Sequence, residues 1–334
     1  MQTSPTHSFR QFTQRFGVLV AVLAGLPVLV AWLTRPEGST YLPFHMSLDD
    51  HMVYAAWMRQ AMEGSFFFDN RFASLESQPG LTVHLYFFVL GLLAKALGIT
   101  LTLTLVRVTL SYVLCVVLSK FITLLDLDER TSKLALVLSV FGGGLAWVSW
   151  QTFGDKIESG PGWFSSLLSG MQPIDNWQPE GFVFPSMLTN GLFLAAGCLI
   201  LVTLISIIKC RDSWKPVLPG AIAFFLLMNI HSYDVLLLAM VLVAYLVSCA
   251  FNMTVTKVWV LRSGVICLAA VPPAVWFWRV LQNDHVFQAR AATPTYSFPI
   301  QCLVAGIATM PMAARIAHGT AMSIVSLRWN RAGK

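Results

Sequence analysis

Long apolar runs recur along most of the chain, separated by shorter stretches that carry the polar and charged residues. Their lengths approach the roughly 20 helical residues that cross a hydrocarbon core of about 30 Å. Backbone groups in lipid must be hydrogen-bonded within their own segment, so we expect α-helices throughout. The nine runs lie at about residues 16–33, 81–97, 99–121, 134–152, 184–208, 217–231, 235–251, 263–281 and 299–317.

The charges that flank the runs indicate how many of them span the membrane. Lys and Arg collect at the cytoplasmic ends of spans, and nine spans would put the basic stretch 209–211 outside. If residues 81–97 instead lie along the outer surface, about eight spans remain and both termini are cytoplasmic. The basic residues then predicted to be cytoplasmic are Arg10, Arg15, Arg130, Lys133, Lys209, Arg211, Lys215, Lys257, Arg262, Arg328, Arg331 and Lys334.

Three segments are predicted on the outer face, at about residues 34–98, 153–183 and 282–298. The first contains a capping-box pattern from Ser47 to Asp50, followed by apolar residues at helical spacing and by Gly64, which can end a helix. We therefore expect a short interfacial helix over 48–63 and a second over 81–97. The fold class is an all-α polytopic membrane protein, with residues 1–334 as a single transmembrane domain.

Composition supports this interpretation and excludes a water-soluble domain. Of 334 residues, 56% are hydrophobic and 11% charged, whereas soluble domains carry about 25% charged residues. The formal net charge of +6 follows from the topology and does not indicate a nucleic-acid partner. Six cysteines without CxxC or Cys/His spacing predict neither a zinc site nor a disulfide framework. The first apolar run is expected to be a retained helix, because no small-residue cleavage site follows it.

Adjacent carboxylates at Asp49 and Asp50 are the first candidates for chemistry. In the first turn of a helix they can simply interact with exposed N–H groups and the helix dipole. At the membrane surface, such a pair can also act as a general base or bind a divalent cation. Asp175 and Glu180, in the second outer segment, would face the same cleft if the two outer segments converge; otherwise they are solvated loop acids.

A second group of candidates lies at the ends of apolar runs. His231, Tyr233 and Asp234 interrupt a long apolar stretch, where they form a turn between two helices and can hydrogen-bond a phosphate or a sugar hydroxyl. Arg107, like other cations in apolar runs, is expected to snorkel to the headgroups. The alternative is that it, or Arg290 in the last outer segment, neutralises a lipid-linked phosphate.

With these residues in place, the chain resembles the amino-terminal part of the GT-C superfamily of integral membrane glycosyltransferases, such as protein O-mannosyltransferases and aminoarabinose transferases. The matching motifs, in order, are SLDDHMVY at 47–54, LGLLAKALG at 90–98 and WQPE at 177–180. The sequence SQPG at 77–80 stands where relatives often have Lys-Pro-Pro or His-Pro-Pro. Family members commonly continue with more spans or an outer domain, so the resemblance is to a truncated member.

The resemblance implies an enzyme of the cell envelope, expected in the bacterial inner membrane, that takes a sugar from a polyprenyl-phosphate carrier. By position, the catalytic aspartate would be Asp49 or Asp50, and the second acidic residue Glu180. His231, Asp234 and Asp175 would be pocket residues. Some relatives use a divalent cation and others do not, so a metal stays open. Membrane lipid and the lipid-linked donor are the expected partners, and oligomeric state is not specified.

Two other classes of function fit the same pattern. A secondary transporter also has many helices and few charges, although its ionisable groups and broken helices usually lie near the midplane, often in repeated halves. Here the carboxylates gather in outer segments and no internal repeat is evident. A noncatalytic subunit of a larger membrane assembly is the third possibility.

Overall fold

The computed structural model describes residues 7–39, 41–43, 48–73, 78–142, 181–286 and 288. They belong to one compact unit formed by residues 1–152 and 171–290, and the second unit, 153–170 with 291–334, lies outside them. Within the described ranges every regular element is helical, apart from an isolated antiparallel bridge between Phe68 and Thr82. The helices are α1 (His7–Leu33), α2 (Leu48–Met62), α3 (Leu85–Leu97), α4 (Ile99–Ile122), the 3₁₀ turn η1 (Thr123–Leu125), α5 (Glu129–Phe141), α9 (Val183–Thr189), α10 (Gly191–Lys209), α11 (Val217–Ile230), α12 (Ser232–Phe251), α13 (Lys257–Leu268) and α14 (Val271–Asn283).

Five helical segments of the described chain are long and apolar enough to cross a membrane, which identifies an integral membrane protein. They are His7–Leu33, Ile99–Leu125, Gly191–Lys209, Ser232–Phe251 and Lys257–Asn283. The apolar helices α3 and α11 are shorter, with 13 and 14 residues. At about 1.5 Å per residue, each extends only about 20 Å.

Eight spans therefore stay a prediction. Of the three other predicted spans, 217–231 corresponds to the short α11, 134–152 is described only to residue 142, and 299–317 lies outside the described residues. The shortness of α3 agrees with the expectation that residues 81–97 do not span.

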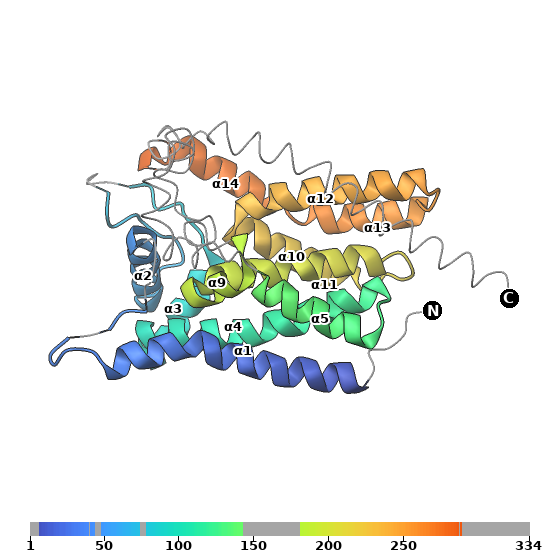
Figure 1. The fold of residues 1–334 in the computed structure, drawn as a ribbon. Coiled ribbons are helices and arrows are strands. Elements are labelled where there is room, and N and C mark those ends of the chain that lie inside the picture. The colour runs from blue at the N-terminus through green and yellow to red at the C-terminus, as the bar shows by residue number, and fades with distance from the viewer. Residues whose placement is uncertain are drawn as a thin grey trace, which may run out of the picture. The chain divides into compact units, whose positions relative to one another are not determined.

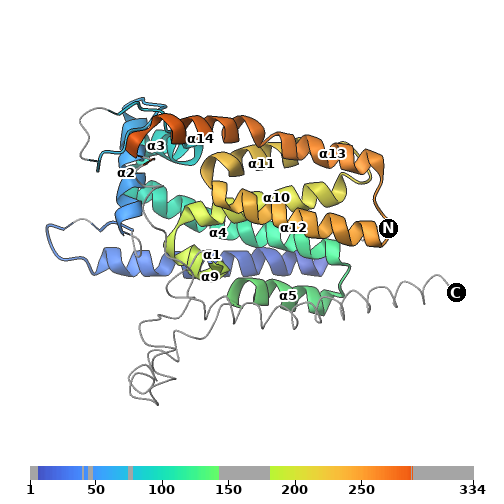
Figure 2. The same ribbon diagram turned by 90° about the horizontal axis from the view of Figure 1, so that it is seen from above.

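The long helices α1, α4, α10 and α12 run alongside one another (Figures 1 and 2); α4, α10 and α12 point away from α2, and α1 runs in the opposite direction. The segment after α1, the α9–α10 junction, the α11–α12 turn and the end of α14 lie at one end, here called the α2 end. At the opposite end lie the turns 123–128, 210–216 and 252–256. Helix α2 runs across the axes of the long helices. Of the three segments predicted to share the outer face, the described parts of 34–98 and 282–298 lie at this end, and most of 153–183 lies outside the described residues.

Close helix contacts depend on small residues. An ideal Cβ on Gly17 of α1 would be 3.0 Å from the Tyr112 ring of α4, and one on Gly25 would be 3.1 Å from Val108. Farther along, Trp259 of α13 is buried and donates from Nε1 to the Ile207 carbonyl of α10 at 2.8 Å. The glycine contacts hold α1 against α4 along their middle, and the Trp259 contact holds α13 against α10 near the end opposite α2.

Helix α2 packs on α3 at the α2 end. Its Met58 is fully buried beside Phe87, Leu90 and Ala94 of α3. The helix ends just before Gly64, whose φ of +100° is a backbone conformation that favours glycine. The predicted helix over 48–63 is confirmed within one residue, and Asp49 and Asp50 lie in its first turn.

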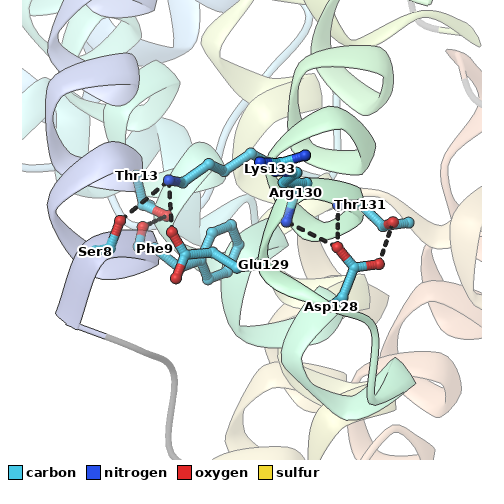
Figure 3. Close-up of polar contacts among 8 residues, drawn as sticks. All are labelled: Ser8, Phe9, Thr13, Asp128, Glu129, Arg130, Thr131 and Lys133. Atoms are coloured by element: carbon cyan, nitrogen blue, oxygen red, sulfur yellow. Dashed lines mark hydrogen bonds and ion pairs between the residues drawn. The ribbon is translucent and has the colours of Figure 1, made fainter.

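The start of α5 is joined to α1 (Figure 3). The Asp128 carboxylate accepts from the backbone N–H groups of Arg130 and Thr131, as an N-cap does, and from the Thr131 hydroxyl. Lys133 contacts Glu129 at 2.7 Å and donates to the hydroxyl of Ser8 on α1 at 3.1 Å. The Glu129–Lys133 ion pair therefore links the start of α5 to α1 through Ser8.

Candidate functional site

The turn after α11 is joined to the segment before α3 by one side chain. Asn229 accepts from the Leu85 backbone N–H at 2.8 Å and donates to the Val83 carbonyl at 3.0 Å. Each hydrogen bond joins two residues that are more than 140 positions apart in the sequence. This clasp fixes His84 beside the turn that contains His231.

His84 is buried and neutral. Its ring lies between those of Trp57 and Phe87, with centroids 5.5 Å and 4.5 Å away. Burial lowers its pKa to about 3; a hydrogen bond with the Ile230 backbone opposes this shift, and the neighbouring His231 adds to it. Its Nδ1 is buried without a hydrogen-bond partner among the described residues. It therefore presents a polar atom that is unsatisfied.

His231 and Asp234 face each other across the first turn of α12. The distance from His231 Nδ1 to Asp234 Oδ2 is 2.8 Å, and the side chains are 19% and 23% exposed. The contact does not have the alignment of a hydrogen bond. Tyr233 is 82% exposed, and only its ring edge approaches His231. Of the three candidate residues predicted at this turn, His231 and Asp234 are brought together, whereas the exposed Tyr233 points away from the buried groups.

Arg107 is the most unusual side chain at this end. It lies in α4, is 3% exposed, and donates from Nη1 to the Leu188 carbonyl of α9 at 2.8 Å. Its Nε and Nη2 are buried and have neither a hydrogen-bond partner nor an ion-paired carboxylate within the described ranges. A buried cation without a counter-charge is strongly destabilising, so this guanidinium is suited to receive an anion.

Segments distant in the sequence surround Arg107. Tyr41, between α1 and α2, is near enough for the guanidinium to lower its pKa, although burial outweighs this effect and raises it. An ideal Cβ on Gly191 would be 2.6 Å from the Tyr86 hydroxyl and 3.7 Å from Arg107 Cα. Only glycine fits there without displacing Tyr86. The residues around Arg107 therefore come from α3, α4, the α9–α10 junction and the segment after α1.

The expectation that Arg107 snorkels to the headgroups is wrong, because its side chain is enclosed by protein. A signal was available in the sequence: Arg107 is eight residues beyond Ile99, about 12 Å into the helix. His84 and Tyr86 were not singled out as site residues at all. Their types are ordinary in an interfacial helix, and only the contacts with α10 and α11 distinguish them.

The carboxylates predicted to be catalytic are described in part. Asp49 is exposed and Asp50 half-buried at the start of α2. Asp175, Glu180 and Arg290 lie outside the described residues, so convergence of the two acidic segments stays a prediction. No cluster of three or more metal-ligating side chains occurs among the described ranges. The question of a divalent cation stays open.

No family model, curated protein or solved structure matches this chain. The proposals that follow therefore depend on the geometry of its own residues and on the motif resemblance given above.

Proposed function

We propose that this protein is a membrane glycosyltransferase that moves a sugar from a polyprenyl-phosphate donor to an acceptor at the outer face of the membrane. The observation that supports it best is the buried, incompletely paired Arg107 at the same end as Asp49, Asp50 and the His231–Asp234 contact. We place the protein in the bacterial inner membrane, with both termini cytoplasmic and the α2 end outside.

A transfer of this kind needs a partner for the departing phosphate. The acceptor oxygen forms a bond to the anomeric carbon while the bond from that carbon to the phosphate oxygen breaks, and the polyprenyl phosphate leaves with the electron pair. A guanidinium stabilises the charge that develops on the phosphate through charge-assisted hydrogen bonds. Arg107 has two nitrogens available for this role, and Arg290 is an alternative by sequence position.

The reaction also needs a base for the acceptor proton. The exposed Asp49 and the neighbouring Asp50 begin a helix that lies across the α2 end, where a substrate can reach them. Either one, or Glu180, would take the proton as the new bond forms. His231, Asp234, Tyr233 and Asp175 would contact sugar hydroxyls. A divalent cation bound by these carboxylates is compatible with the same chemistry.

Sugar transfer in isolated membranes tests this proposal. Membranes containing equal amounts of the wild-type chain or of Asp49→Asn, Asp50→Asn, Glu180→Gln or Arg107→Gln would receive radiolabelled polyprenyl-phosphate sugars. The matched control is Arg35→Gln, because Arg35 is an exposed arginine at the same end. We expect Arg107→Gln to lower transfer by about 100-fold or more, at least one carboxylate variant to lose transfer, and Arg35→Gln to match the wild type.

Folding must be checked in parallel, because Arg107→Gln also removes a hydrogen bond to Leu188. Arg107→Lys keeps the positive charge. If this variant elutes as a single species in detergent, any loss of transfer that it shows is a chemical defect and not a result of misfolding. If the wild type, all variants and empty membranes gave equal transfer, the proposal would be wrong. A secondary transporter or a noncatalytic subunit would then be the better interpretation.

A further inference from the structure

Two neighbouring turns at the end opposite α2 form a strongly basic surface. One turn joins α10 to α11 over residues 210–216, and the other joins α12 to α13 over residues 252–256. With the adjoining helix ends they contain five cationic side chains and one carboxylate, that of Asp212. We call this surface the basic corner; its cations are Lys209, Arg211, Lys215, Lys257 and Arg262.

Arginine side chains hold the two turns together. Arg262 of α13 donates from Nη1 to the carbonyls of Cys210 and Arg211 at 2.9 and 3.0 Å. Arg211 in turn donates to the Thr254 carbonyl. Both turns thus present their charges in a fixed arrangement, in contrast to separate flexible loops.

The charges of this surface are not neutralised within the described part of the protein. Arg211, Lys215 and Lys257 are exposed, and neither lysine forms an ion pair or hydrogen bond with a described residue. The α4–α5 corner at the same end is different, because there Asp128 caps α5 and Glu129 pairs with Lys133 (Figure 3). Positive charge at span ends is common, but residues 120–133 have three carboxylates for three cations, whereas the basic corner has one carboxylate for five cations.

Helix dipoles do not explain all of these cations. Lys209 and Arg211 lie at the carboxyl end of α10, where a positive charge is favourable. Lys257, however, is the first residue of α13, and Lys215 directly precedes the N-cap of α11. Positive charge at those helix starts is unfavourable, so an external anion would offset both the side chains and the dipoles.

Trp214 indicates the depth of the basic corner in the bilayer. Its side chain is 50% exposed, and the Arg262 guanidinium lies 5.3 Å from the ring centroid. Tryptophan is enriched at the level of the lipid headgroups, and the spanning helices α10 and α12 end beside it. The lysine amines are therefore at the height of phosphate groups.

We propose that the basic corner binds the phosphate headgroup of an anionic phospholipid, with Arg211, Lys215 and Lys257 as the contacts. A membrane lipid is the occupant that charge complementarity and depth favour. This site is separate from the proposed sugar-transfer site at the α2 end.

Counting bound lipids by native mass spectrometry of the full-length chain tests the proposal. The purified protein would be titrated with phosphatidylglycerol or with phosphatidylcholine of the same acyl chains, in a low-salt volatile buffer. We compare the wild type with the double variant Lys215→Gln/Lys257→Gln. The matched control is Lys120→Gln/Arg130→Gln, which removes two exposed cations near the α4–α5 corner.

The wild type and the control should retain phosphatidylglycerol in preference to phosphatidylcholine. The Lys215→Gln/Lys257→Gln variant should bind phosphatidylglycerol about 30-fold more weakly, since two basic side chains at an anionic surface are removed. Its thermal unfolding temperature should match that of the wild type, because both lysines are exposed. Equal affinity for the two lipids, or equal weakening in both double variants, would overturn the proposal.

Discussion

Replacing Gly91 by alanine tests whether the position of α2 controls the candidate site. An ideal Cβ on Gly91 would lie 2.4 Å from Ala61 Cβ and 2.7 Å from the Met58 carbonyl oxygen. Carbon atoms pack at about 3.5–4.0 Å, so α2 would have to move outward by about 1 Å. Overpacking destabilises a folded protein by about 1–3 kcal/mol, whereas the higher helix propensity of alanine stabilises it by about 1 kcal/mol relative to glycine. Because one contact is with rigid backbone, we expect a net loss of about 2 kcal/mol.

The same displacement should affect activity more than stability. Asp49 and Asp50 begin α2, and a misplacement of about 1 Å at a reacting group can lower a rate by about 100-fold. Thermal unfolding in detergent and sugar transfer in membranes would be measured together. Gly264→Ala is the matched control, because no atom beyond the adjoining backbone of α13 lies within 4 Å of its ideal Cβ. If Gly91→Ala unfolded and transferred sugar as the control does, α2 would not be positioned by this contact.

Three further perturbations have outcomes that the structure specifies. Because the pKa of His84 is about 3 when folded, the folded protein binds fewer protons than the unfolded chain between about pH 6.5 and 3. When the pH falls from 6.5 to 4.5, the free energy of unfolding should therefore decrease by about 2–3 kcal/mol more in the wild type than in His84→Gln. Thermal unfolding in detergent at each pH measures this difference. An equal pH dependence of stability in the two proteins would contradict the burial of a neutral imidazole. Asn229→Ala removes two hydrogen bonds and should destabilise the α2 end by about 2 kcal/mol. Limited proteolysis between α2 and α3 should then be faster than in the wild type. An unchanged cleavage rate would argue against the clasp. Asp128→Ala should lower the protection factors of the amides in the first turn of α5, and acidification should lower them in the wild type as its carboxylate is protonated. Protection factors are compared because intrinsic exchange itself slows with falling pH; equal protection of variant and wild type at neutral pH would show that the cap is dispensable.

Helix positions were predictable wherever long apolar runs met clear boundaries. The prediction of 99–121 differs from α4 by one residue at its end, because the charges that follow mark the end of the run. The prediction of 184–208 missed a break at Asn190, which separates α9 from α10 and caps α10 through its side chain. Apolar periodicity alone does not distinguish a continuous helix from two helices in line, although Asn-Gly at 190–191 is a local turn signal.

A similar break divides the predicted run 263–281. Helix α13 ends at Leu268 and α14 begins at Val271, just before Pro272 and Pro273. Proline has no backbone N–H and is accommodated at a helix start, so the pair fits a new helix better than the middle of an old one. The combined length still satisfies the criterion for a span.

The candidate site was predictable only where polar residues interrupt apolar sequence. His231 and Asp234 were found in this way, and the structure brings them into contact. Arg107 was seen but misjudged, because its burial depends on α9 and α10, which follow it by about 80 residues. The depth of Arg107 in α4 was a local signal, but the identity of the helices that enclose it depends on chain-distant packing, which leaves none.

The Asn229 clasp has a consequence for biogenesis. The segment before α3 acquires these two hydrogen bonds only after the ribosome has added about 144 more residues. At about 5–20 residues per second, α2 and α3 would wait roughly 7–30 s at the membrane surface before α11 arrives. During that interval their apolar faces need lipid or the insertion machinery as a temporary partner, so mutations that slow the emergence of α11 should expose this part of the nascent chain to proteases.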